Sequence, residues 1–251
     1  MVRGIDKFKE YFEDYAGQYV FIGGAACDIL LGNMGVDFRS TKDLDIVLLI
    51  EALNGDFVNT FICFIESGGY EHIDKGTGEN QFFRFSKPRD ITFPHMIELF
   101  SKKPDYIESI MSRLSPIHIS DDVMSLSAIL LDEAYYNLLR TGVTVVDKIS
   151  VLNLEYIILF KMKAWLDLIE RKNCGEKIDS KDIKKHKNDV FRLAVNLEND
   201  ARVSISGQVK KDAEKFMQRA KVNPLDLKNL GIRNILYEEL VKVLEECYGI
   251  E

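Results

Sequence analysis

The hydrophobic positions along the chain follow two different patterns, and the change between them divides the sequence into two parts. In the first part, apolar residues at helical spacing predict a helix over residues 5–17, and a short apolar run predicts a strand over residues 19–22. Similar runs predict the other elements of this part: helices over 25–31 and 54–68, and strands over 45–50, 80–86 and 95–100. This order is typical of a small mixed sheet with helices packed against it.

The second part, after about residue 120, has mostly helical periodicity. It predicts helices over residues 125–142, 152–172, 180–197, 207–221 and 233–248. Residues 143–152 form either a short strand or an extended connector, and the polar stretch 171–182 is the best candidate for a loop between helices. The sequence therefore predicts an α/β domain over residues 1–118 and a helical domain over residues 119–251.

Composition narrows the class of protein. Of the 251 residues, 46% are hydrophobic and 29% are charged, as expected of a chain that folds around a core. The net charge of -7 argues against a protein that coats nucleic acid through its overall field, although a local basic patch could still bind RNA or phosphate. The four cysteines form no CxxC pair, which argues against a zinc ribbon. The charged N-terminal residues lack a signal-peptide core, so we expect a cytoplasmic protein.

The first candidate for chemistry is a pair of glycines, Gly23 and Gly24, between a predicted strand and a predicted helix. Glycines at this position let the backbone approach a ligand closely, and the following helix N-terminus offers free N–H groups to a phosphate. A tight turn without a ligand is the alternative explanation. The third glycine of the dinucleotide-binding GxGxxG motif is missing.

The second candidate is the acidic pair Asp43 and Asp45 at the start of the strongest predicted strand. Residues two apart in a strand point to the same face, so both carboxylates can bind the same cations. Two like charges this close repel each other unless a cation or a proton intervenes. The alternative is a solvated Asp-x-Asp segment that only begins the strand.

Taken together, the two motifs resemble the nucleotidyltransferase superfamily, in which a Gly-Gly or Gly-Ser turn is followed by a DxD or DxE pair. The segment RSTKDLDIVL, residues 39–48, is similar to the AbiEii branch of abortive-infection (type IV) toxins, where an R-x-T-x-D-x-D segment follows a GGxA turn. The resemblance implies an α+β protein, with a nucleotidyltransferase-like mixed β-sheet, flanking helices and a C-terminal helical domain. It also implies that the following residues contact the nucleotide: Gly23, Gly24, Arg39, Thr41 and Lys42.

The resemblance further implies a third carboxylate on a neighbouring strand, because two Mg²⁺ ions are poorly neutralised by two carboxylates. The best candidate is Glu98, an acid within the predicted strand 95–100, so the expected metal ligands and catalytic residues are Asp43, Asp45 and Glu98. The family usually has aspartate at this place. Glu98 could instead be buried against a basic partner, and Asp90 is the alternative third acid.

Lysines in the helical part resemble those of AbiEii-like proteins. Lys161 stands in an apolar stretch that resembles the K-x-x-A helix of these proteins. Burial of its charge is costly unless the side chain reaches an anion such as a triphosphate or a carboxylate. The alternative is a side chain that extends to the surface. Lys185 belongs to a later basic-acidic helix. We expect Lys161 and Lys185 to bind nucleotide. The cluster around Lys185 is either a solvated helix face or a nucleic-acid patch.

The leading hypothesis is a Mg²⁺-dependent nucleotidyltransferase that moves a nucleotidyl group from a nucleoside triphosphate to a hydroxyl of tRNA or of a protein. Such an enzyme could be the toxin of a toxin–antitoxin or phage-defence system, with an antitoxin protein as partner and no membrane association. The first alternative is a catalytically degenerate nucleotide- or protein-binding module of the same fold. A dinucleotide-dependent α/β enzyme is the last alternative, since it leaves Asp43 and Asp45 unexplained.

Overall fold

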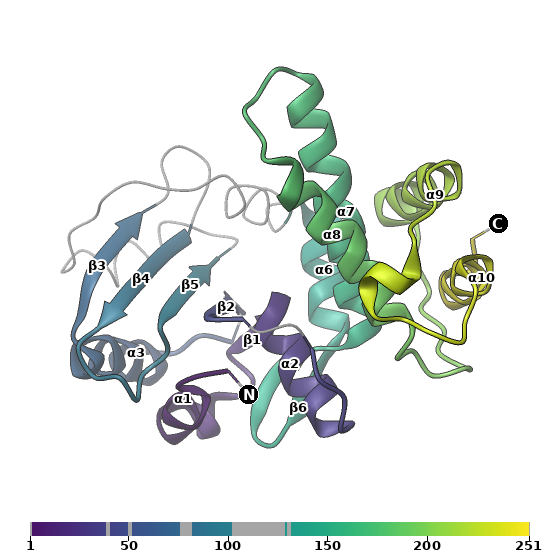
Figure 1. Ribbon diagram of the computed structural model, residues 1–251. Coiled ribbons are helices and arrows are strands. Elements are labelled where there is room, and N and C mark those ends of the chain that lie inside the picture. Colours follow the sequence, from purple (N-terminus) through teal and green to yellow (C-terminus); the bar gives the residue numbers. More distant parts are fainter. Residues whose placement is uncertain are drawn as a thin grey trace. The chain divides into compact units, whose positions relative to one another are not determined.

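The computed structural model describes residues 2–38, 41–49, 52–75, 82–101, 129 and 132–250. The chain divides into two compact units (Figure 1). Unit 1 comprises Met1–Leu131 and Leu139–Asn153, and unit 2 comprises Asp132–Leu138 and Leu154–Glu251. The domain boundary predicted at residues 118 and 119 lies outside the described residues.

A mixed sheet forms the centre of unit 1. Within the described residues it has seven strands in the order β3-β4-β5-β2-β1-β7-β6. Their bounds are β1 Tyr19–Ile22, β2 Asp43–Leu48, β3 Tyr70–Lys75, β4 Phe82–Pro88, β5 Met96–Phe100, β6 Val143–Val146 and β7 Ile149–Leu152. Strand β2 pairs antiparallel with β1 and parallel with β5. A dinucleotide-binding domain needs a mostly parallel sheet, so this pairing argues against the dinucleotide-dependent alternative.

The sheet extends beyond the strands that the sequence predicts. Strand β3 was not predicted, and it pairs with β4 at one edge of the sheet. Residues 143–152, left open between a strand and a connector, form the hairpin β6–β7, and β7 pairs in parallel with β1. Asp147 and Lys148 close this hairpin with φ of 48° and 67°. Both values lie in the left-handed region that a two-residue type I′ turn requires.

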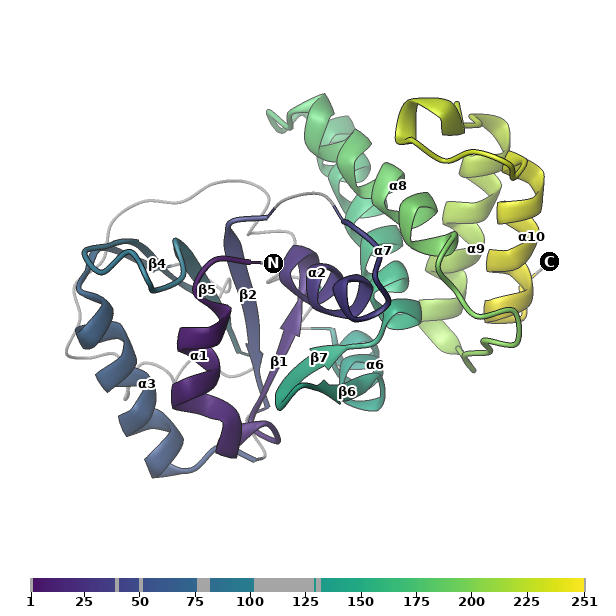
Figure 2. The same ribbon diagram turned by 60° about the horizontal axis from the view of Figure 1, so that its bottom comes forward.

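Two helices of unit 1 pack an aromatic core against the sheet. They are α1 (Ile5–Phe12), which the short 3₁₀ helix η1 (Glu13–Tyr15) follows, and α3 (Gly55–Gly68). Figure 2 shows α1 and α3 side by side along the sheet. The ring centroid of Phe64 on α3 lies 5.6 Å from the ring centroid of Phe8 and 5.3 Å from that of Phe12, both on α1. Phe8 in turn lies 4.9 Å from Phe21 on β1, so aromatic side chains join both helices to the sheet.

The third helix of unit 1, α2 (Gly23–Asn33), begins directly after β1 and packs against β1, β2 and β7. Its first residues are the predicted glycine pair. Gly24, Ala25 and Ala26 are all buried. Small side chains at the start of α2 therefore allow a close approach between this helix and the end of β1.

Unit 2 consists of helices. Their bounds are α6 Glu133–Thr141, of which the last three residues belong to unit 1, α7 Leu154–Asn173, α8 Ser180–Ala194, α9 Gly207–Val222, the 3₁₀ helix η2 Leu227–Leu230 and α10 Tyr237–Tyr248. The long helix α7 packs against α8 and α9 (Figure 2). Helix α8 begins at the cap residue Asp179, whose side chain accepts a hydrogen bond from Lys181 N at 2.8 Å. In the described part of the chain, no helix combines the length and the apolar character needed to cross a membrane.

Candidate active site

Three charged side chains form a row across neighbouring strands of unit 1. Asp45 on β2 is in register with Glu98 on β5, and Glu98 is in register with Arg84 on β4. Residues paired across adjacent strands share a face of the sheet, and Asp43 shares that face because it precedes Asp45 by two residues. The structure therefore brings the three predicted carboxylates to one face. The opposite face carries the apolar side chains that meet α1 and α3.

Asp45 lies against the glycine turn. Gly23 has a φ of +64°, which only glycine adopts at low cost, and a Cβ atom there would overlap Oδ2 of Asp45 and lie 3.1 Å from its Cγ. The carboxylate thus occupies the space that the missing side chain leaves free. The sequence offered a ligand or a tight turn as the reason for a glycine at this position, and in the structure the group that lies against Gly23 is the carboxylate of Asp45.

Thr41 lies against the second glycine. A Cβ atom on Gly24 would be 2.9 Å from Oγ1 of Thr41. Thr41 is therefore close to the first turn of α2, whose N–H groups lack helical partners. Lys42 is exposed beside this site, and Arg39 lies outside the described residues. Of the predicted nucleotide-binding set, Gly23, Gly24 and Thr41 are brought together with the acids.

Glu98 has a basic partner inside the site. Nε and Nη2 of Arg84 lie 2.8 Å and 2.6 Å from the same oxygen, Oε1 of Glu98. Glu98 is 6% exposed, and the Arg84 side chain is 14% exposed. Sequence reasoning allowed a basic partner for Glu98 but did not identify Arg84. The sequence feature that could have identified Arg84 is its position as a lone basic residue between Phe83 and Phe85.

The protonation of Glu98 reflects this crowded setting. Burial raises the pKa of the Glu98 carboxyl above its ordinary value, and the charge of Asp43 acts in the same direction. The Arg84 guanidinium opposes the rise through its charge and its hydrogen bond, as does a hydrogen bond with Asp45. The net direction is upward because burial is the largest of these causes.

Asp43 and Asp45 supply oxygen ligands of the kind that Mg²⁺ prefers. In the described part of the chain, no three His, Cys, Asp or Glu side chains are placed to hold a metal ion together. Mg²⁺ is commonly bound by one or two carboxylates plus waters and substrate phosphates, so Asp43 and Asp45 suffice as protein ligands. The alternative third acid, Asp90, lies in a turn after β4. Its Oδ1 accepts hydrogen bonds from Thr92 N at 2.8 Å and Thr92 Oγ1 at 2.7 Å.

Lys161 has a carboxylate partner within unit 2. Its Nζ lies 3.3 Å from Oδ2 of Asp189 on α8, and Asp189 is completely buried. The neighbouring Lys163 lies 3.1 Å from Oδ2 of Asp212, which also accepts a hydrogen bond from Tyr135 at 3.1 Å. The burial of Lys161 is thus explained by a carboxylate, one of the two anions considered for it. Its role in nucleotide binding stays a prediction.

The basic cluster of α8 has side chains of two kinds. Lys181 and Lys184 are exposed, and Lys185 is half-buried. Lys187 is buried, donates to the backbone oxygen of Asn223, and lies 5.7 Å from the ring centroid of Trp165. Burial lowers the pKa of Lys187. The cluster is therefore partly a packing surface, and nucleotide binding by Lys185 stays a prediction.

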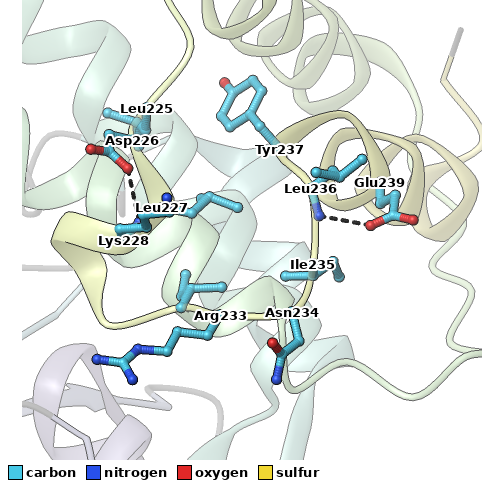
Figure 3. A pocket seen from close by; sticks show the side chains of 11 residues that line it. Leu225, Asp226, Leu227, Lys228, Arg233, Asn234, Ile235, Leu236, Tyr237 and Glu239 are labelled. Carbon is cyan, nitrogen blue, oxygen red and sulfur yellow. Dashed lines mark hydrogen bonds between the residues drawn. The ribbon is translucent and has the colours of Figure 1, made fainter.

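A hollow of about 730 Å³ lies within unit 2, between η2 and the start of α10 (Figure 3). Its lining mixes apolar side chains such as Ile235 and Leu236 with Arg233 and Lys228. The acids of its lining serve the local backbone, because Asp226 caps Lys228 N and Glu239 accepts a hydrogen bond from Leu236 N. The described residues that line this hollow include none of the predicted site residues.

Comparison with known proteins gives a similarity in structure but none in sequence. No protein family model matches the chain. No curated protein matches it either. Among solved structures, the chain is similar to an antigenic nucleotidyltransferase-like protein from Paracoccidioides brasiliensis, with a TM-score of 0.44 and 15% identity over 91% of this chain and 93% of that chain. Function is therefore inferred from the side chains of this chain.

Proposed function

We propose that this chain is a Mg²⁺-dependent nucleotidyltransferase, which transfers a nucleotidyl group from a nucleoside triphosphate to a hydroxyl acceptor. The observation that supports this proposal is the position of Asp45, which lies against Gly23 at the start of α2 and in register with Glu98. A helix N-terminus that binds phosphate and carboxylates that bind a cation are thereby adjacent. A nucleoside triphosphate needs a phosphate-binding group and a cation-binding group at the same place.

The residues of the site have distinct roles in this proposal. Asp43 and Asp45 hold the cation, and the N–H groups at Gly23 and Gly24 donate hydrogen bonds to phosphate oxygens. Thr41, with Arg39 and Lys42, adds contacts to the nucleotide. A Mg²⁺ ion held there would neutralise phosphate charge and help to orient the phosphates for in-line attack. The acceptor hydroxyl then forms a bond to the α-phosphorus as the bond to pyrophosphate breaks, and positioning supplies most of the rate enhancement.

The finer parts of the proposal come from the resemblance to AbiEii-like toxins. They are a tRNA or protein acceptor, a neutralising antitoxin protein, a cytoplasmic location and a second Mg²⁺ ion with Glu98 among its ligands. Nucleotide contacts by Lys161 and Lys185 belong to the same group.

A second candidate function is a nucleotide- or protein-binding module without catalytic activity. The Arg84–Glu98 ion pair favours it, because a carboxylate that is neutralised by arginine is a weaker metal ligand. This alternative predicts that the chain binds nucleotide without turnover.

The test is a transfer assay. Purified protein is incubated with each α-³²P-labelled nucleoside triphosphate, Mg²⁺, and either total tRNA or protein extract. The proposal expects label in an acceptor and released pyrophosphate, with both signals lost in Asp43→Asn/Asp45→Asn. Nucleotide binding that saturates without any labelled acceptor supports the non-catalytic module instead. Transfer that persists in the double variant contradicts the proposed site.

A further inference from the structure

The hollow of unit 2 has the size of a ligand site. It lies between η2 and the start of α10 and has a volume of about 730 Å³ (Figure 3). Binding sites for small organic molecules usually measure about 300–1,000 Å³ and combine apolar walls with a few polar groups. No residue to which the proposed function assigns a role is among the described residues of its lining. Any ligand of this hollow is therefore bound at a second site.

Apolar side chains form one part of the lining. Leu225, Ile232 and Ile235 are half-buried, and Leu236 is 65% exposed. Removal of such surface from water favours binding, so a ligand with an apolar body gains affinity from this wall. A fully hydrated ligand such as inorganic phosphate gains nothing from it.

Two basic side chains give the hollow its second property. Lys228 from η2 and Arg233 from the segment that follows η2 are both exposed. Figure 3 shows them on the η2 side of the hollow, away from Leu236 and Glu239. In the described part of the chain, neither of the two basic side chains forms an ion pair. Their N–H groups are therefore available as donors to an anion.

The two acids of the lining are engaged elsewhere. Both oxygens of Asp226 accept hydrogen bonds, Oδ1 from Lys228 N at 3.0 Å and Oδ2 from Asn229 Nδ2 at 3.2 Å. Oε2 of Glu239 accepts a hydrogen bond from Leu236 N at 2.7 Å. Each acid thus caps the start of a helix, Asp226 that of η2 and Glu239 that of α10. The side-chain donors of the two basic residues remain for a ligand.

We propose that this hollow binds a small aliphatic or aromatic carboxylate. The carboxylate group pairs with Lys228 and Arg233, and the apolar body of the ligand covers Ile235 and Leu236. The planar fork of arginine matches a carboxylate, and lysine adds a compact charge. The inference goes beyond the proposed function and does not depend on it, because it concerns a different ligand and residues of unit 2 alone.

The probe is anilinonaphthalene sulfonate (ANS), a fluorescent anion with an aromatic body. The full chain is titrated with ANS, and phenylbutyrate is then added as the competing carboxylate. We expect ANS to bind saturably and phenylbutyrate to displace it. Phenylbutanol, which has the same apolar body without the charge, is expected to displace ANS at least about tenfold less well, because a charge-assisted contact is lost.

Variants of the lining separate charge from apolar contact. Lys228→Gln/Arg233→Gln is expected to weaken the binding of ANS and of phenylbutyrate by at least about tenfold. Leu236→Ser is expected to weaken phenylbutyrate binding severalfold, since it removes part of the apolar wall. The matched control is Lys184→Gln/Lys211→Gln. It removes two exposed lysines of unit 2 that lie outside the described lining and form no ion pair with described residues, and it should leave both affinities unchanged.

Circular dichroism checks that each variant folds. Unchanged affinities in a folded Lys228→Gln/Arg233→Gln would mean that ANS binds adventitiously, and equal displacement by phenylbutanol would mean that the charge is not recognised. Displacement by ATP or by an acidic peptide but not by phenylbutyrate would assign the hollow to another class of ligand. Each of these results overturns the inference and leaves the proposed function intact. If the double variant does not fold, the comparison of phenylbutyrate with phenylbutanol on the wild-type chain decides.

Discussion

Replacing Gly23 by alanine tests the link between the glycine turn and the acids. The new Cβ atom would overlap Oδ2 of Asp45, so either the carboxylate must move or the turn must open. The φ of +64° adds a backbone penalty for any residue with a Cβ atom. We expect Gly23→Ala to lose both stability and cation binding.

The size of the effect follows from two contributions. A left-handed backbone costs alanine about 1–2 kcal/mol relative to glycine. Displacing Asp45 from its preferred side-chain conformation costs about 0.5–1.5 kcal/mol more. The expected loss in the free energy of unfolding is therefore about 1.5–3.5 kcal/mol. Cation affinity falls because Asp45 no longer lies beside Asp43 in the same geometry.

Gly35→Ala is the matched control. Gly35 has a φ of +73° and lies in the same unit, but a Cβ atom there would meet nothing within 4 Å. Both variants share the backbone penalty and the effect of alanine on the unfolded chain, so their difference isolates the contact with Asp45. Urea denaturation gives the stabilities, and Mn²⁺ titration gives the affinities. Equal losses of stability in the two variants, with unchanged Mn²⁺ affinity in Gly23→Ala, would refute the reasoning.

Variants at three further sites test contacts within unit 1 and within unit 2, and urea denaturation measures the stability of each. Asp189→Ala should lower the free energy of unfolding by about 3–5 kcal/mol, because it leaves Lys161 buried without its carboxylate partner. Lys161→Met/Asp189→Leu should recover most of that loss, and an equal loss in both variants would contradict the ion pair. Phe64→Ala should cost about 3–5 kcal/mol, since Phe64 is fully buried among aromatic rings, and a loss under about 1 kcal/mol would contradict that packing. Asn54→Ala should cost about 1 kcal/mol by removing the cap of α3, whereas Asn54→Ser should cost little.

The sequence predicts best those elements whose own residues carry a strong pattern. Strand β1, the apolar part of β2 and the long helix α7 lie where the sequence predicts them. Strand β3 was missed because Tyr-Glu-His-Ile-Asp-Lys has no apolar run. It is an edge strand that relies on β4 for its pairing, and an edge strand can carry charged residues that a central strand does not tolerate. Its existence is thus determined by a neighbour and not by its own pattern.

In the candidate site, too, the arrangement within one strand was predictable and the pairing between strands was not. That Asp43 and Asp45 share a face follows from the two-residue period of a strand, so it was predictable. That Glu98 stands opposite Asp45 depends on the register between β2 and β5, which no feature of either strand reveals. The approach of Asp45 to Gly23 likewise depends on the register of β1 with β2, in which Ile22 pairs with Asp45.

Glu98 and Lys161 show what a charged residue in an apolar stretch indicates. Both attracted a functional interpretation because an ionised side chain cannot be buried without a counter-charge. That requirement is met equally by a ligand and by a residue of the same chain. Here Arg84, 14 residues from Glu98 in the sequence, and Asp189 provide the counter-charges. Local sequence therefore reveals that a partner must exist but not which one. A ligand is more reasonably sought at Asp43 and Asp45, which are only half-buried, and Asp45 lies against Gly23 at the start of α2.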